Sequence, residues 1–182
     1  MANYIARTVT ENPAYMQAQI KVPAGQTYHA GQVVVAESLD NSIRGNLSVY
    51  APTAVADITK EDIAILLNNG FETMADGRRP DGQPDYTQYE FRAGDVVTAH
   101  RLLPQTRYEI SIDACAKSVQ DATIAPGDNL IPKNGSLELE YSKTGTAVTA
   151  KNYLTIEATK YFRLGGLYGE QFASTLVVRA KA

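Results

Sequence analysis

Apolar and polar residues alternate along three segments in the second half of the chain. Tyr108, Ile110, Ile112 and Ala114 alternate with polar residues over 107–114, and the same period covers 137–142 and 154–159. A period of two predicts half-buried antiparallel strands with one face in solvent. Further strands are predicted at 16–22, 32–37, 46–50 and 175–179, so we expect about eight to ten strands.

One segment, 60–68, has helical spacing. Ile63, Leu66 and Leu67 form an apolar stripe at i, i+3 and i+4. Thr59 is a good N-cap, and Gly70 fits the left-handed residue that ends a helix. The pattern predicts one short helix, which packs on a sheet because about nine residues are too few for a stable isolated helix.

A short phrase occurs three times: a small residue or proline, then glycine, then Gln or Asp, then apolar residues. The copies are Ala30-Gly31-Gln32, Ala93-Gly94-Asp95 and Pro126-Gly127-Asp128. Glycine reaches positive φ without a Cβ penalty, and Gln or Asp is common in turns. We interpret the phrase as the turn that precedes a strand.

The fold class predicted is therefore mainly β, an antiparallel β-barrel or sandwich with one short helix and an extended N-terminal arm. Residues 1–22 have dispersed apolar positions and are predicted as the arm, with a strand near its end. Residues 23–182 are predicted as a single β-rich domain with a helix and loop insertion at about 57–90. The polar stretch 76–89 is rich in Gly and Pro, and long loops of this kind are usually functional or mobile.

Composition narrows the function classes. The 182 residues are 44% hydrophobic, enough for a core, and the net charge is −3 with Arg78-Arg79 as the one basic doublet. Nucleic-acid binding needs a basic stripe, so neither nucleic-acid nor membrane binding is expected. No apolar stretch approaches the roughly 20 residues of a membrane span, and no signal peptide is visible. The one cysteine, Cys115, excludes an internal disulfide.

Candidate chemistry is sparse. The two histidines, His29 and His100, are interpreted as polar surface residues, and Cys115 as a small apolar residue. A Cys115–His100 nucleophile pair and a hydrolase with two converging carboxylates stay open as alternatives. The loop aspartates at 76, 81 and 85 do not have EF-hand spacing. We expect no catalytic residue, no cofactor and no metal site.

Binding chemistry is better represented. The chain has eleven tyrosines, four phenylalanines and no tryptophan. Tyrosine is favoured at protein interfaces and also on half-buried β surfaces, so both interpretations stay open. The two neighbouring arginines of the loop could anchor a carboxylate or phosphate. The candidate partner-binding residues are Tyr4, Tyr15, Arg78, Arg79, Tyr86 and Tyr89.

Taken together, these features resemble the capsid decoration, or cement, proteins of tailed phages. The resemblance lies in Ala24-Gly25 followed by 30–34, in 91–97 and in 124–128, which are similar to the starts of strands in small β-barrel decoration proteins. The predicted helix and the long loop depart from the smallest members of that class.

The resemblance implies a structural virion protein, made in the host cytoplasm, that binds the major capsid protein on the capsid surface and stabilises the lattice. It implies no enzymatic activity. An arm that adds a strand to a neighbour's sheet would be one binding mechanism. Homo-oligomerisation stays open. The alternative function is a ligand-binding β-domain, such as a carbohydrate-binding or tail-associated receptor-binding module.

Overall fold

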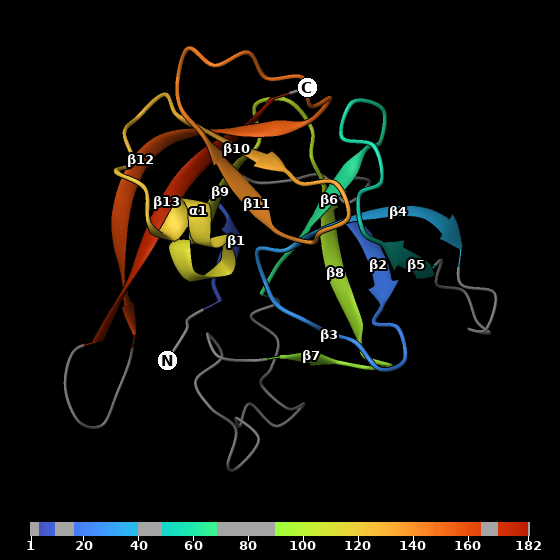
Figure 1. Cartoon of the computed structure of the whole chain (residues 1–182). Coiled ribbons are helices and arrows are strands. Elements are labelled where there is room, and N and C mark those ends of the chain that lie inside the picture. The colour runs from blue at the N-terminus through green and yellow to red at the C-terminus, as the bar shows by residue number, and fades with distance from the viewer. Residues whose placement is uncertain (1–3, 10–16, 40–48, 69–89, 165–170, 182) are drawn as a thin grey trace.

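The strands form a closed five-stranded barrel and a six-stranded antiparallel sheet, which lie side by side in Figure 1. The computed structural model describes residues 4–9, 17–39, 49–68, 90–164 and 171–181. The barrel runs β2 (Gln17–Lys21), β5 (Val49–Thr53), β4 (Val33–Leu39), β6 (Ile63–Leu66) and β8 (Val96–Arg101). The sheet runs β1 (Ala6–Thr8), β9 (Arg107–Ser111), β13 (Gln171–Lys181), β12 (Tyr153–Leu164), β10 (Asn129–Pro132) and β11 (Leu139–Ser142).

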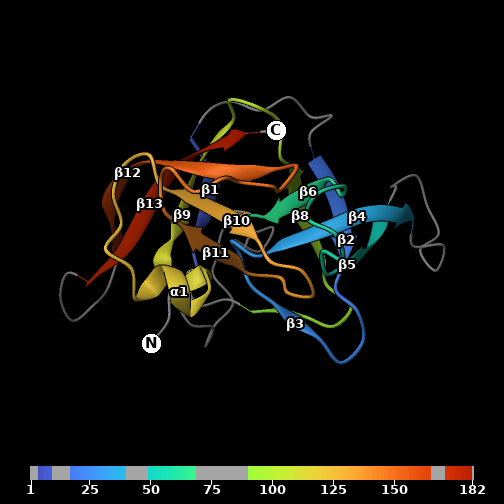
Figure 2. The same ribbon diagram turned by 45° about the horizontal axis from the view of Figure 1, so that its top comes forward.

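The prediction of a mainly β fold is confirmed, with one difference in strand direction. In the barrel, β2 and β5 are parallel, with Gln19 opposite Val49, whereas the other neighbouring strands pair antiparallel. Two short strands, β3 (Thr27–Tyr28) and β7 (Phe91–Arg92), form a separate antiparallel pair below the barrel in Figure 1. Figure 2 shows the same arrangement with the top of the molecule turned forward.

The helix predicted at 60–68 is wrong. Residues 63–66 are strand β6, which pairs with β4 on one side and β8 on the other. All four residues are buried, so the segment needs apolar side chains on both faces, and a continuous apolar run also satisfies helical spacing. Ile63 and Ile65 are β-branched, which favours a strand.

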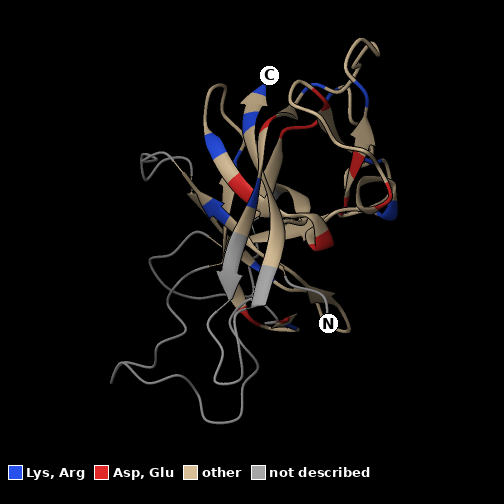
Figure 3. Ribbon diagram, turned by 90° about the vertical axis from the view of Figure 1, so that its left-hand side faces the viewer, with Lys and Arg blue, Asp and Glu red and all other residues tan. Residues whose placement is uncertain are grey.

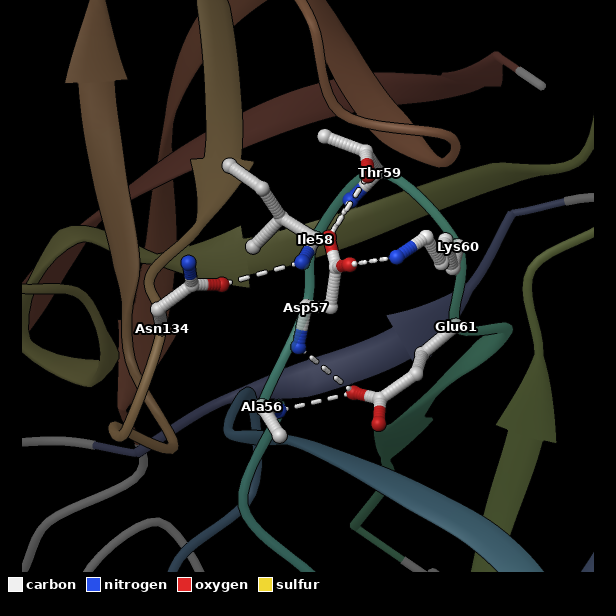
Figure 4. Close-up of polar contacts among 7 residues, drawn as sticks. All are labelled: Ala56, Asp57, Ile58, Thr59, Lys60, Glu61 and Asn134. Atoms are coloured by element: carbon white, nitrogen blue, oxygen red, sulfur yellow. Dashed lines mark hydrogen bonds and ion pairs between the residues drawn. The ribbon is translucent and has the colours of Figure 1, made fainter.

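The predicted helix start is instead an isolated turn (Figure 4). The carbonyl of Asp57 accepts the N–H groups of Lys60 and Glu61, both at 3.1 Å. The Asp57 carboxylate accepts the N–H of Thr59 at 3.0 Å, and the Glu61 carboxylate accepts the N–H groups of Ala56 at 2.7 Å and Asp57 at 3.2 Å. These are the capping interactions of a helix start, used here to fold a single turn.

The one α-helix among the described residues lies elsewhere. A 3-10 turn (Ile112–Ala114) leads to α1 (Lys117–Gln120), where the sequence predicted that the alternating strand continues to residue 114. The strand β9 ends at Ser111, and its predicted wet face is also buried, since Glu109 and Ser111 are 4% and 0% exposed. Among the described residues, no helix is long and apolar enough to cross a bilayer.

The segment 1–22, predicted as an arm, contributes two strands to the fold. In the six-stranded sheet, β1 pairs with β9, with Ala6 opposite Ile110. In the barrel, β2 pairs with β8 over residues 17–21 and closes the barrel against β5. Ile5, Ala18 and Ile20 are buried, so these strands belong to the core of the chain itself. The described parts of 1–22 are therefore integral to both sheets and do not form a free arm.

The repeated glycine phrase forms the same turn at each of its three sites. The glycines have positive φ, at 90° for Gly31, 93° for Gly94 and 95° for Gly127. The residue after each glycine donates its N–H to the carbonyl three positions earlier, and the residue before the glycine does not have positive φ, which defines a type II turn. The three type II turns precede β4, β8 and β10, which confirms the interpretation.

The three type II turns also share their contacts. The side-chain oxygen after the glycine accepts an N–H from three residues earlier, as in His29 to Gln32 at 2.9 Å, Arg92 to Asp95 at 2.8 Å and Ala125 to Asp128 at 2.8 Å. The glycine N–H donates to a neighbouring backbone carbonyl, that of Leu66, Val22 or Ile156, and the N–H of that neighbour donates back to the turn. Each turn thus joins the start of one strand to another segment.

Both outer strands of the six-stranded sheet are covered along their edges. Asn68 covers β1, since its side chain accepts the Ala6 N–H at 2.6 Å and its own N–H donates to the Ala6 carbonyl at 2.9 Å. The α1 region covers β11, where Leu139 accepts the Ala116 N–H and the Ser118 hydroxyl accepts the Tyr141 N–H.

The β12–β13 pair extends beyond the sheet. The two strands pair from Tyr153–Lys181 to Leu164–Gln171, but β10 pairs with β12 at residues 154–155 and β9 pairs with β13 at 175–179. Within the described chain, residues 158–164 therefore pair as a strand only with β13, and residues 171–174 pair only with β12; we call these two segments together the ribbon. In Figure 1 it extends from the sheet toward the lower left.

One hydrophobic core joins the barrel and the sheet. A single cluster contains Ile20 and Ile65 from the barrel together with Ile110, Leu154 and Leu176 from the sheet, each at most 1% exposed. The two sheets therefore stabilise each other.

Candidate functional site

Tyr4 is the one predicted partner-binding residue that the described chain contains. Tyr15, Arg78, Arg79, Tyr86 and Tyr89 lie outside the described residues. Tyr4 lies two residues before the start of β1 and is fixed by Asn68, whose side-chain amide donates to the Tyr4 carbonyl at 3.0 Å.

The Tyr4 ring stacks on the ring of His29. Their centroids are 3.9 Å apart and their planes differ by 15°. His29 begins the first type II turn, so its position follows from that turn. It was interpreted as a polar surface residue, but it is half-buried, and its Nδ1 atom has no hydrogen-bond partner within the described chain.

The stacked pair borders a polar pocket of about 420 Å³. Asp113 lines it from the 3-10 turn, Lys117 and Gln120 line it from α1, and Glu138 lines it from the segment before β11. The lining thus combines an aromatic surface with carboxylates and one ammonium group. We call it the Tyr4 pocket.

The electrostatics of the Tyr4 pocket keep its aromatic pair neutral. Burial raises the pKa of Tyr4, and the charges of Glu90, Asp113 and Glu138 raise it further. Burial lowers the pKa of His29, with Glu90 opposing. At neutral pH, Tyr4 therefore keeps a hydroxyl that can donate a hydrogen bond, and the His29 ring is uncharged.

Cys115 also lines the Tyr4 pocket but is not suited to nucleophilic chemistry. Burial, followed by the charges of Glu138 and Asp113, raises the pKa of its thiol to about 12. The thiolate is the reactive form, and at neutral pH the thiol stays protonated. Its Sγ atom donates to the Ser111 carbonyl at 3.8 Å.

The Cys115–His100 alternative is not assembled at this pocket. His100 is buried on β8, 4% exposed, in an edge-to-face contact with Tyr108, and it does not line the Tyr4 pocket. The interpretation of His100 as a surface residue is therefore wrong. Within the described chain, no group of three His, Cys, Asp or Glu side chains is placed to hold a metal ion.

The hydrolase alternative required two carboxylates in one cleft. Asp113 and Glu138 both line the Tyr4 pocket, and both act as negative charges on Tyr4 and Cys115. The pair was not identified from the sequence, where Glu138 was assigned to the wet face of a strand. The same carboxylates equally suit recognition of a basic side chain.

The described tyrosines serve different roles. Tyr28 and Tyr108 are buried in the core, and Tyr161 on the ribbon is 79% exposed. Tyr50 lies beneath the Arg101 guanidinium at 5.3 Å, beside a second pocket of about 290 Å³.

Figure 3 shows Lys and Arg interspersed with Asp and Glu on the side of β12 and β13.

In comparisons with known proteins, no family model, no curated protein sequence and no solved structure matches this chain.

Proposed function

We propose that the protein is a structural, non-enzymatic virion protein that binds the outside of a phage capsid lattice and stabilises it. The supporting observation is the Tyr4 pocket, a preformed hollow that combines a fixed aromatic pair with charged groups of both signs. Tyrosine at a polar rim is typical of protein interfaces, because it supplies contact area and a hydrogen-bonding tip. The pocket suits a basic side chain of the major capsid protein, held between the ring of Tyr4 and the carboxylates of Asp113 and Glu138.

The structure changes how such binding would work. An arm that lends a strand to a neighbour was one of the mechanisms considered from the sequence, but β1 and β2 already pair with strands of their own chain. Binding through the Tyr4 pocket needs no release of either strand. Many copies on a repeating lattice would then add avidity to a modest single contact.

Co-sedimentation with assembled capsids tests the proposal. The wild-type protein should pellet with capsids, and Tyr4→Ala should lower its affinity by about tenfold or more, the scale of losing one well-placed aromatic contact. Tyr153→Ala is the control, since Tyr153 is a half-buried tyrosine of β12 outside the pocket. A melting curve for each variant shows whether the fold is kept.

The outcomes separate function from site. A wild-type protein that stays in the supernatant at every concentration refutes capsid binding. Wild-type binding that Tyr4→Ala leaves unchanged keeps the function but moves the contact away from the Tyr4 pocket.

The carbohydrate-binding alternative receives less support. It predicts a concave patch with several exposed tyrosines, and among the described tyrosines Tyr161 alone is exposed. A glycan array with no hits would be the expected result.

A further inference from the structure

Among the residues that the structure describes, the outer edge of β12 has no strand partner over seven residues. In the described chain, the β10 side of β12 is occupied at Leu154, Thr155 and Ile156, and no strand pairs with that edge over residues 158–164. The strand register shifts between Ile156 and Ala158, where this free part begins. Thr159, Lys160 and Tyr161 are all exposed, so both faces of the ribbon meet solvent there.

The direction of the free backbone groups follows from the pairing. On β13, Ala180 donates to Thr106 and accepts from Gln105, so it is turned away from β12. The backbone N–H and C=O groups of successive residues in a strand point to alternate sides. Where two opposite residues share no hydrogen bond, the groups of both point away from the strand pair. The β12 partners of Leu176, Ser174 and Phe172 therefore face away from β13; these partners are Thr159, Tyr161 and Arg163.

We infer that two copies of this chain pair through this edge, β12 against β12, as an antiparallel two-fold dimer centred on Tyr161. The pairing goes beyond capsid binding and does not depend on it. It would join the two six-stranded sheets into one continuous sheet through the ribbons.

The register centred on Tyr161 satisfies all the outward-facing groups of the free edge. Tyr161 lies opposite its copy, and Thr159 lies opposite Arg163 in each direction, which makes three pairs of outward-facing residues. Each such pair exchanges two N–H···O bonds, so the interface would contain about six. The intervening position places Lys160 opposite Phe162, so no two charged residues lie directly opposite each other. Residues 158–164 of both copies are used without reaching β10.

The edge favours a second copy of the chain because it is complementary to itself. A two-fold axis pairs a surface with itself, so the surface must be self-complementary. The register centred on Tyr161 meets this requirement. The other edges of the six-stranded sheet are covered by Asn68 and by the α1 region, and the barrel is closed. The outer edge of β13 is less open than that of β12, because β13 also contacts the 3-10 turn at 112–114.

Cysteine cross-linking of the full chain tests the register. Directly opposite residues of this type lie about 5.5 Å apart at Cα, within the range for a disulfide. Tyr161→Cys should therefore give a covalent dimer under mild oxidation. Ser174→Cys is the matched control, since Ser174 is exposed and opposite Tyr161 on β13. Three strand spacings, about 14 Å, would separate it from its copy. The native Cys115 is buried and does not compete.

Sedimentation equilibrium tests the pairing without a cross-link. The wild-type protein should be dimeric at micromolar concentration, and Tyr161→Pro should raise the dimer dissociation constant by at least about tenfold. Proline removes an N–H that faces away from β13, so the β12–β13 pairing and the circular dichroism spectrum should be kept. A monomeric wild-type protein overturns the inference, as does a cross-link formed by Ser174→Cys and not by Tyr161→Cys.

Discussion

Gly31 and Gly94 occupy equivalent positions in two of the three type II turns but have different surroundings. A Cβ on Gly31 would lie 2.6 Å from the Cβ of Ala114 and 3.2 Å from Cγ2 of Ile110, whereas a Cβ on Gly94 would meet nothing within 4 Å. Gly31 therefore has two requirements, a positive φ and close contact between the barrel and the β9 side of the sheet. Gly94 has the first requirement alone.

The pair allows the two costs to be measured separately. Alanine at either position should cost about 1–2 kcal/mol for the left-handed backbone. Gly31→Ala should lose about 1–3 kcal/mol more, because the backbone or Ala114 must shift to relieve the overlap. Urea unfolding of both variants measures the difference in unfolding free energy. Equal losses would show that the overlap with Ala114 is relieved at no cost.

The sequence predicts one residue of the Tyr4 pocket as a binding residue and misses the others. Tyr4 was identified as a candidate because of its residue type and its place near the N-terminus. Its partner His29 was not, because the stack joins residues 25 positions apart through the docking of β1 beside the first type II turn. No local pattern encodes that contact. Asp113 was predicted to lie in a strand, but β9 ends at Ser111 and Asp113 lies in the 3-10 turn.

At the scale of elements, the period-two segments were predictable and the ambiguous ones were not. The alternation at Leu154 and Ile156 predicted β12 correctly because one face of that strand is partly exposed to solvent, as the pattern requires. Residues 63–67 are apolar throughout, and such a run satisfies a strand buried on both faces as well as a helix. The four residues of α1 are too few for a periodic signal. Burial on both sides is a tertiary property, which the local pattern does not contain.

The type II turn before β10 differs from its counterpart before β8 in how many elements it joins. Asp128 is buried and accepts the Thr144 N–H at 2.9 Å and the Tyr141 hydroxyl at 2.8 Å in addition to the Ala125 N–H. Its side chain thus links the turn to β11 and to the turn at 143–146. Asp95 is bound to the Arg92 N–H within its own turn.

Asp128→Ala should therefore destabilise the protein more than Asp95→Ala. Asp128→Ala leaves three donors in part-buried hydrogen bonds without their acceptor, which costs about 1–3 kcal/mol, while loss of one exposed turn contact costs about 1 kcal/mol or less. Chemical unfolding at pH 7 measures both. Equal effects would show that the links to Thr144 and Tyr141 contribute nothing.

The same carboxylate predicts a pH dependence. Hydrogen bonds, that of Thr144 first, hold the pKa of Asp128 below its ordinary value of 3.8. A carboxyl with a lowered pKa in the folded state contributes stability above its unfolded pKa, and that contribution is lost as pH falls through the folded pKa. The stability gap between wild type and Asp128→Asn should be constant from pH 7 to about pH 5 and shrink below pH 4. A gap that widens on acidification would contradict this sign.

At the scale of the whole molecule, the barrel and the six-stranded sheet depend on each other and on the first 22 residues. One core spans both, and the chain enters the sheet through β1 before it enters the barrel through β2. A boundary at residue 22 would cut both sheets, since β2 is the strand that closes the barrel between β5 and β8. The N-terminal segment is then a condition for folding and not a detachable binding arm.

Deletion of residues 1–22 tests this directly. The truncated chain should show no cooperative thermal transition, because it lacks buried Ile5, Ala18 and Ile20 and leaves the edges of β5 and β8 unpaired. Far-UV circular dichroism and a melting curve measure the loss. A synthetic peptide of residues 1–22, added in excess, should restore part of the transition, which separates a missing strand from general misfolding. A truncated chain that melts like the full chain and no longer binds capsids would instead establish a separate arm.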